Sequence, residues 1–294
     1  MRLGCRAFLI AWAFLLPVTI VAVGGRAQEA PSASGNEILR QVRADILAKR
    51  WEQARAKLDA VSGLEANPEY HFLHAAVLLH GQELTLALGE VDRAIAIDPQ
   101  QADYYLLRGQ MYETIRGIAA AQRDYHKNID LAPASAAGVL LLEQLLIRER
   151  RPEEALALLQ GAVRRMPKSP TLYFELGRAQ EILRRPTEAL AAYQRAVELD
   201  PKLGAARVGL GRLYRNNPET LVKSLEHLRR AVALEPRNAV WQYELGLTYL
   251  RQGNLEAARA ALEKSAELNP MTGMSSVLWP PPTAASRCLR RPPR

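Results

Sequence analysis

Three features of the sequence predict an all-α protein, an α-solenoid built from antiparallel helix pairs. Hydrophobic residues make up 48% of the chain but aromatic residues only 6%. Alanine and leucine, both good helix formers, make up most of the other hydrophobic residues. Prolines recur at intervals of 34, 34, 34, 35 and 34 residues, at Pro99, Pro133, Pro167, Pro201, Pro236 and Pro270. Self-similarity with a period of this length indicates stacked helical repeats.

Small residues recur at two places inside each repeat. With the proline numbered as position 32, we expect these places to be where the two helix backbones cross closely. Position 8 is small at Ala75, Gly109, Gly177, Gly211 and Gly246. Position 20 is small at Ala87, Ala121, Ala155, Ala189, Ser224 and Ala258.

A large residue and a helix ending also recur. Position 24 is expected to fill the space between adjacent repeats, and the proline ends the second helix because it cannot continue the hydrogen-bond ladder. Gly117 and Gly253 are expected to supply the left-handed conformation at the end of a first helix. The residues at position 24 are Val91, Tyr125, Leu159, Tyr193, Leu228 and Leu262.

These motifs resemble the tetratricopeptide-repeat family. The resemblance implies a right-handed superhelix (the TPR superhelix) that acts as a protein-interaction scaffold. A seventh, degraded repeat is expected over residues 35–67, where Trp51, Ala54 and Leu58 fit the pattern of a second helix. The six clear repeats span 68–272, as 68–101, 102–135, 136–169, 170–203, 204–238 and 239–272.

The N-terminus has the layout of a secretory signal peptide. Two arginines precede an uncharged run, Ala7 to Val23, and small residues flank a cleavage site after Ala27. We therefore expect a signal peptide over 1–27, a flexible leader over 28–34, and export to the periplasm. The 17-residue run also reaches the lower limit for a membrane-spanning helix. An inner-membrane anchor is the alternative, although Pro17 disfavours an unbroken span.

The net charge of +8 does not indicate a nucleic-acid partner. Residues 1–27 contribute +3 and residues 271–294 contribute +4, so residues 28–270 carry only about +1. A nucleic-acid-binding fold should carry its basic residues as a patch on the fold itself. The two cysteines, Cys5 and Cys288, lie outside the repeats, so a disulfide framework is not expected.

The last segment, 273–294, is rich in proline and arginine and is expected to be disordered. It cannot form a third capping helix, and solenoids usually need a polar terminal cap. We therefore expect an apolar edge around Leu262 and Leu268. Three interpretations stay open. A partner covers this edge, or a second copy covers it in a homo-oligomer; the tail is an ordinary disordered linker; or the tail is not the natural one.

The family resemblance places a peptide ligand in a concave groove lined by the first helix of each repeat. Position 5 predicts an apolar rail for an extended peptide or a helix, with helix packing as the alternative. The rail consists of Phe72, Leu106, Leu140, Phe174, Val208 and Tyr243.

Position 9 changes along the array from Gln110 and Gln144 to Arg178 and Arg212. Together with Arg215 and Asn216, these arginines predict a basic wall for an acidic peptide, because arginine binds carboxylates through two hydrogen bonds. Neighbouring glutamates (Glu175, Glu181 and Glu244) are the alternative, since they would neutralise the wall. The residues with which some relatives bind a chaperone's terminal carboxylate are missing here.

No enzyme motif stands out. His71 and His74 are three residues apart, but the sequence shows no third or fourth metal ligand, and no cofactor is expected. A phosphate-binding loop and a nucleophile elbow are also missing. The sequence therefore predicts a non-enzymatic scaffold that binds a protein or peptide. The alternative is a membrane-anchored structural subunit of an envelope assembly or secretion complex.

Overall fold

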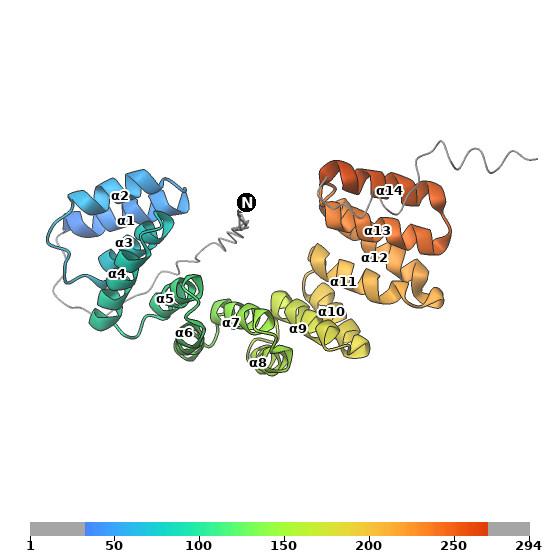
Figure 1. Ribbon diagram of the computed structural model, residues 1–294, viewed down its shortest axis with the longest axis horizontal. Helices are drawn as coiled ribbons and strands as arrows, with labels where there is room; N and C mark the ends of the chain where they lie inside the picture. Colours follow the sequence, from blue (N-terminus) through green and yellow to red (C-terminus); the bar gives the residue numbers. More distant parts are fainter. Residues whose placement is uncertain (1–32, 270–294) are drawn as a thin grey trace, which may run out of the picture. The chain divides into compact units, whose positions relative to one another are not determined.

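The computed structural model describes residues 33–269, which form fourteen α-helices and one short 3₁₀ helix (Figure 1). The chain divides after Gly117 into two compact parts, and each is described by itself. The N-terminal part covers residues 33–117 and the C-terminal part covers residues 118–269. The expected all-α architecture is confirmed for this range.

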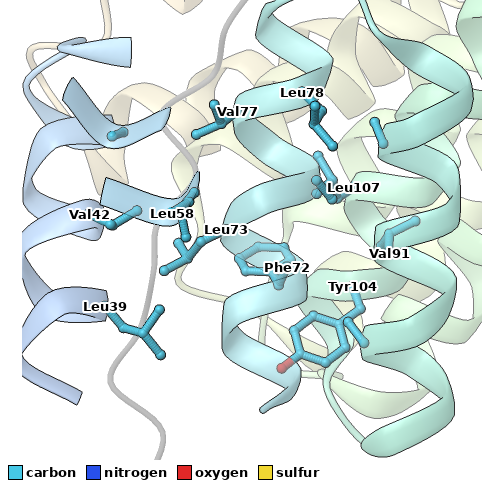
Figure 2. Packing of buried hydrophobic residues seen from close by; sticks show 14 of the residues in the cluster. Leu39, Val42, Leu58, Phe72, Leu73, Val77, Leu78, Val91, Tyr104 and Leu107 are labelled. Atoms are coloured by element: carbon cyan, nitrogen blue, oxygen red, sulfur yellow. The ribbon is translucent and has the colours of Figure 1, made fainter. Parts of the chain in front are cut away.

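The N-terminal part contains five helices. Figure 2 shows Leu39 and Val42 of the first helix and Leu58 of the second facing Leu73 of the third, so residues 35–67 share a core with the repeat that follows them. Ala54 is buried in the same core. The helices are α1 (Ala33–Leu47), α2 (Trp51–Ala60), α3 (Pro68–His80), α4 (Leu84–Ile97) and α5 (Ala102–Thr114). The first two residues of α1, 33 and 34, belong to the segment expected to be a flexible leader, 28–34.

The C-terminal part continues the same alternation. We call the first helix of each pair helix A and the second helix B. Each helix A packs against its own helix B and against the helix B that precedes it. The A helices are α7 (Ala137–Arg148), α9 (Pro170–Ile182), α11 (Gly204–Arg215) and α13 (Ala239–Gln252). The B helices are α6 (Ile118–Leu131), α8 (Pro152–Arg165), α10 (Pro186–Leu199), α12 (Leu221–Leu234) and α14 (Leu255–Leu268), with a 3₁₀ turn, η1 (Pro218–Thr220), before α12.

The small residue at position 8 lies directly under the large residue at position 24. A Cβ atom added to Gly177 would lie 2.6 Å from the ring of Tyr193, and one added to Gly246 would lie 2.7 Å from Leu262. The Tyr193 ring also comes within 2.6 Å of a Cβ added to Gly209 in the next repeat. Position 24 therefore fills space within its own repeat, and Tyr193 also fills space between repeats as expected.

The turn from helix A to helix B needs a left-handed residue at position 15. Gly253 has a φ of 79° and matches the expectation. Gly117 does not, because it lies at position 16 and the left-handed residue is Arg116, with a φ of 57°. A side chain in this conformation costs about 1–2 kcal/mol. Lys49, Gln82, Arg150 and Arg184 occupy the same position with the same sign of φ. The fifth repeat differs, because its extra residue lies in a turn that contains η1.

Position 4 fixes the turn between repeats, a feature that the sequence pattern did not reveal. In the second, fifth and sixth repeats its side chain hydrogen-bonds to the backbone carbonyl six residues earlier. Tyr105 Oη donates to Pro99 O over 3.1 Å, Arg207 Nη2 to Pro201 O over 2.7 Å, and Gln242 Nε2 to Pro236 O over 3.1 Å. These bonds satisfy the carbonyl group of the proline that follows each helix B, which lies outside the helix.

The expected apolar edge of the last repeat is wrong at Leu262. This side chain is buried because position 24 points toward its own helix A, and Leu268 is partly buried. The outer face of α14 carries ion pairs instead, Arg259 with Glu263 at 2.7 Å and Lys264 with Glu267 at 2.9 Å. The described end of the array therefore has a largely charged surface.

The expected signal peptide, most of the leader and the proline-rich tail lie outside the described residues. The uncharged run of Ala7 to Val23 and the cleavage site after Ala27 belong to that part of the chain. Within residues 33–269, the helices are all too short or too polar to cross a membrane.

Candidate interaction surface on the A helices

The predicted apolar rail is interrupted in the N-terminal part. Phe72 is buried, and its ring packs against the ring of Tyr104 with centroids 5.1 Å apart. Figure 2 shows both side chains in the core. Leu106 and Gln110 on α5 are partly buried. Phe72 is therefore a core residue, as the packing interpretation of position 5 required.

The rail is also interrupted in the C-terminal part. Val208 is only 6% exposed and belongs to the core between α11, α12 and α13. Leu140, Phe174 and Tyr243 remain partly exposed, and the Phe174 ring lies 5.9 Å from the Tyr193 ring. A continuous apolar strip is therefore a wrong description of position 5, because two of its six members turn into the core.

Each arginine of the predicted basic wall forms an ion pair with a glutamate. Arg178 pairs with Glu175 on the same helix at 2.5 Å. Arg212 of α11 reaches Glu181 of α9 at 2.5 Å. Arg215 of α11 reaches Glu244 of α13 at 2.6 Å. The neutralising glutamates that the sequence suggested are therefore in place. Asn216 follows α11 and is exposed, and Gln144 on α7 is partly buried.

The two members of each pair are not equally exposed. The side chains of Arg178, Arg212 and Arg215 are 39%, 41% and 18% exposed. The side chains of Glu175, Glu181 and Glu244 are 10%, 21% and 12% exposed. In every pair the guanidinium is the outer group and the carboxylate the inner one. We call Arg178, Arg212 and Arg215 the guanidinium surface.

Two hydrogen bonds fix Glu181, the carboxylate beneath Arg212 of the guanidinium surface. Tyr193 Oη donates to Glu181, and the same carboxylate oxygen accepts from Arg212. Burial lowers the pKa of Arg212, but the charge of Glu181 and its hydrogen bond outweigh this effect and raise the pKa overall. Burial, reinforced by Glu181, raises the pKa of the Tyr193 hydroxyl. Tyr193 is therefore a neutral donor that positions Glu181.

Sequence reasoning missed Glu143 on α7. Its side chain is fully buried, and neither carboxylate oxygen has a hydrogen-bond partner. Burial and then the charge of Glu175 raise its pKa to about 7, although Arg178 works in the opposite direction. The signal was available, because Glu143 is the one large residue at position 8, where the other repeats have glycine or alanine.

Two of the three histidines of the N-terminal part, His71 and His74, line a cavity of about 470 Å³ between α3 and α4. His71 Nδ1 lies 2.6 Å from Glu90 and His71 Nε2 lies 2.9 Å from the carbonyl of Glu65, so both ring nitrogens have partners. His74 Nδ1 is 3.8 Å from Glu90. Among residues 33–269, no group of three or more histidine, cysteine, aspartate or glutamate side chains could hold a metal ion. Through its contact with the Glu65 carbonyl, His71 stabilises the turn before α3.

Comparison with known families identifies the class of protein. The sequence profile of the tetratricopeptide repeat matches residues 39–102, 140–203 and 223–270, more than half of the chain. The chain therefore belongs to the tetratricopeptide-repeat family, as its 34-residue period indicated. Proteins of this family are generally non-catalytic scaffolds, and the fold is consistent with protein–protein interaction. No curated protein matches the chain in sequence.

Solved structures share this fold. Yeast Tom70 is 20% identical with a TM-score of 0.62, and the match covers 87% of this chain and 57% of Tom70. A chain of the APC/C hetero-tetramer Cut9–Hcn1 is 18% identical with a TM-score of 0.61, covering 83% of this chain and 46% of that one. PilF of Pseudomonas aeruginosa is 16% identical with a TM-score of 0.59, covering 71% and 95%. These likenesses concern the fold, and they confirm the solenoid of helix pairs.

Proposed function

We propose that the protein is a non-enzymatic scaffold that binds a segment of another protein on the A helices of its C-terminal part. The observation that carries the proposal is the surface of α7, α9, α11 and α13. Leu140, Phe174 and Tyr243 remain partly exposed there beside three positioned arginines. Mixed aromatic and arginine surfaces of this kind are typical of protein interfaces.

A position-specific cross-linking experiment tests the scaffold. A photoreactive amino acid replaces Thr171, exposed on helix A of the fourth repeat, or Ala191, exposed on helix B of the same repeat. We expect a discrete cross-linked protein from Thr171 and none from Ala191. Equal cross-linking at both positions, or none at either, would contradict binding on the A helices.

We further propose that the scaffold works in an exported compartment, the periplasm, after cleavage behind Ala27. The arginine-flanked run of Ala7 to Val23 supports this proposal. A second candidate is a membrane-anchored structural subunit of an envelope assembly or secretion complex, favoured by the length of the same run. Mass spectrometry of the chain from fractionated cells separates the two. A soluble form beginning at Gln28 supports the first, and an intact N-terminus in the membrane fraction supports the second.

A further inference from the structure

We propose that the guanidinium surface binds a segment rich in glutamate or aspartate on the partner protein. This inference rests on the proposed function, because it names the chemistry of the segment that the A helices take. Three features of the C-terminal part carry it: the order of exposure in the ion pairs, the unused hydrogen-bond donors, and the distribution of charge between A and B helices.

The buried glutamates orient the arginines without covering them. Each carboxylate lies beneath its arginine, so the guanidinium reaches the surface in a held position. Two of the pairs connect different helices, Arg212 to Glu181 and Arg215 to Glu244. An arginine that is already held loses less conformational freedom when a ligand binds, which favours association.

Each of these arginines also keeps free donors. Arg178 uses Nη1 for Glu175, Arg212 uses Nη2 for Glu181, and Arg215 uses Nη1 for both atoms that it contacts on Glu244. A guanidinium has five N–H groups in a planar fork. In the described part of the chain, each arginine can therefore still offer N–H groups to a carboxylate from outside.

The charges of the C-terminal part separate between the two kinds of helix. Helices α7, α9, α11 and α13 carry six arginines, four glutamates and no lysine, a net charge of +2. Helices α6, α8, α10, α12 and α14 carry ten basic and ten acidic residues. The four glutamates of the A helices are at most 21% exposed, whereas five of the six arginines are partly or fully exposed and only Arg207 is buried, so the A side presents cations outward. An acidic segment complements this side and not the B side.

The experiment uses the full chain and fluorescein-labelled probe peptides of alternating serine and glutamate. Matched peptides carry glutamine or lysine in place of glutamate, and a single-stranded DNA of equal charge tests for phosphate binding. Fluorescence anisotropy is measured at low and at physiological salt. We expect the glutamate peptide to bind about tenfold or more tightly than the glutamine peptide, with an affinity that falls as salt rises.

The variant Arg178→Gln with Arg212→Gln should lose this preference, with an affinity about tenfold lower. The matched control is Arg195→Gln with Arg230→Gln. Those exposed arginines form 2.9 Å pairs with Glu198 and Glu226 on B helices. Arg178→Lys with Arg212→Lys keeps the charge but removes the fork, and we expect a partial loss. Circular dichroism and the melting temperature establish that each variant is folded.

Three results would overturn the inference: equal binding of the glutamate and glutamine peptides, unchanged binding in the Arg178 and Arg212 variant, or equal loss in the B-helix control. DNA bound as tightly as the glutamate peptide, and lost in the same variant, would replace an acidic protein segment with a nucleic acid. A partner cross-linked at Thr171 without any binding of the glutamate peptide would leave the scaffold intact and reject only this inference.

Discussion

Two neighbouring repeats of the C-terminal part surround their large residue at position 24 with different side chains. We call the surroundings of Tyr193 the tyrosine layer and those of Leu159 the leucine layer. Between α9 and α11, the Tyr193 ring lies between Gly177 and Gly209, each too close to admit a Cβ atom without movement. One repeat earlier, position 24 is Leu159, and the flanking positions carry Glu143 and Glu175. A large side chain between two glycines is thus exchanged for a smaller one between two glutamates.

The comparison teaches that two layers can both be fully packed and still differ in the charge that they bury. Both layers are packed, since Tyr193, Leu159 and Glu143 are fully buried. In the tyrosine layer the hydroxyl group of Tyr193 points outward and donates a hydrogen bond to Glu181. In the leucine layer a carboxyl group stays inside, and only Arg178 faces the two acids. A buried charge without a full set of partners is costly, so only the leucine layer carries this cost.

The largest expected effect is a pH dependence of stability that Glu143 introduces into the leucine layer. The folded-state pKa of Glu143 is raised from 4.5 to about 7, so the folded state holds the proton more tightly than the unfolded state. The contribution of Glu143 to stability is therefore fully present below pH 4.5 and is lost as the pH rises to about 7, by about 3 kcal/mol.

The matched variants are Glu143→Gln and, as a control, Glu153→Gln, which removes an exposed glutamate from α8. Urea unfolding from pH 4.5 to pH 8 measures the difference between each variant and the wild type. We expect this difference to change with pH only for Glu143→Gln. A constant difference for Glu143→Gln would show that Glu143 is ionised over the whole range.

The next effect tests the tyrosine layer. Gly177→Ala places a Cβ atom 2.6 Å from the Tyr193 ring, and we expect a loss of about 2 kcal/mol from overpacking. Adding Tyr193→Leu should restore room, so the double variant should lose less than the sum of the two single variants. Thermal unfolding of the four proteins measures this coupling. Strict additivity would mean that Gly177 is not small because of Tyr193.

A smaller effect concerns the hydroxyl of Tyr193. Tyr193→Phe keeps the ring and removes the hydrogen bond to Glu181, and we expect a loss of about 1 kcal/mol. The equivalent change at Tyr249, Tyr249→Phe, removes a bond to Arg229 near the end of the array and serves as a comparison. Chemical denaturation checks both variants. An unchanged midpoint for Tyr193→Phe would show that Glu181 is held by Arg212 alone.

The smallest effect lies at the turns that both layers share. Arg184→Gly should stabilise the protein by about 0.5–1 kcal/mol, because the left-handed conformation at position 15 suits glycine. Gly253→Ala should have the opposite sign at the equivalent turn. Melting temperatures of the two variants decide the matter. Two shifts of the same sign would contradict position 15 as the source of the strain.

The sequence by itself determined the repeat phase, the helix pairs and the family. The 34-residue spacing of the prolines and the small residues at positions 8 and 20 are local requirements that return in every repeat, so their pattern is visible without coordinates. The nearness of Glu175 and Glu181 to Arg178, each three residues away on the same helix, was also visible from helix spacing.

Only the tertiary structure decided which of these residues a partner can reach. Phe72 and Val208 occupy the same repeat position as Leu140 but are buried, because the neighbouring helix covers them. Arg212 meets Glu181 across 31 residues of sequence, and the deeper placement of the glutamate makes the arginine the outer charge. Exposure and pairing depend on the helix packed alongside, and a periodic pattern specifies the position of a side chain but not its neighbours.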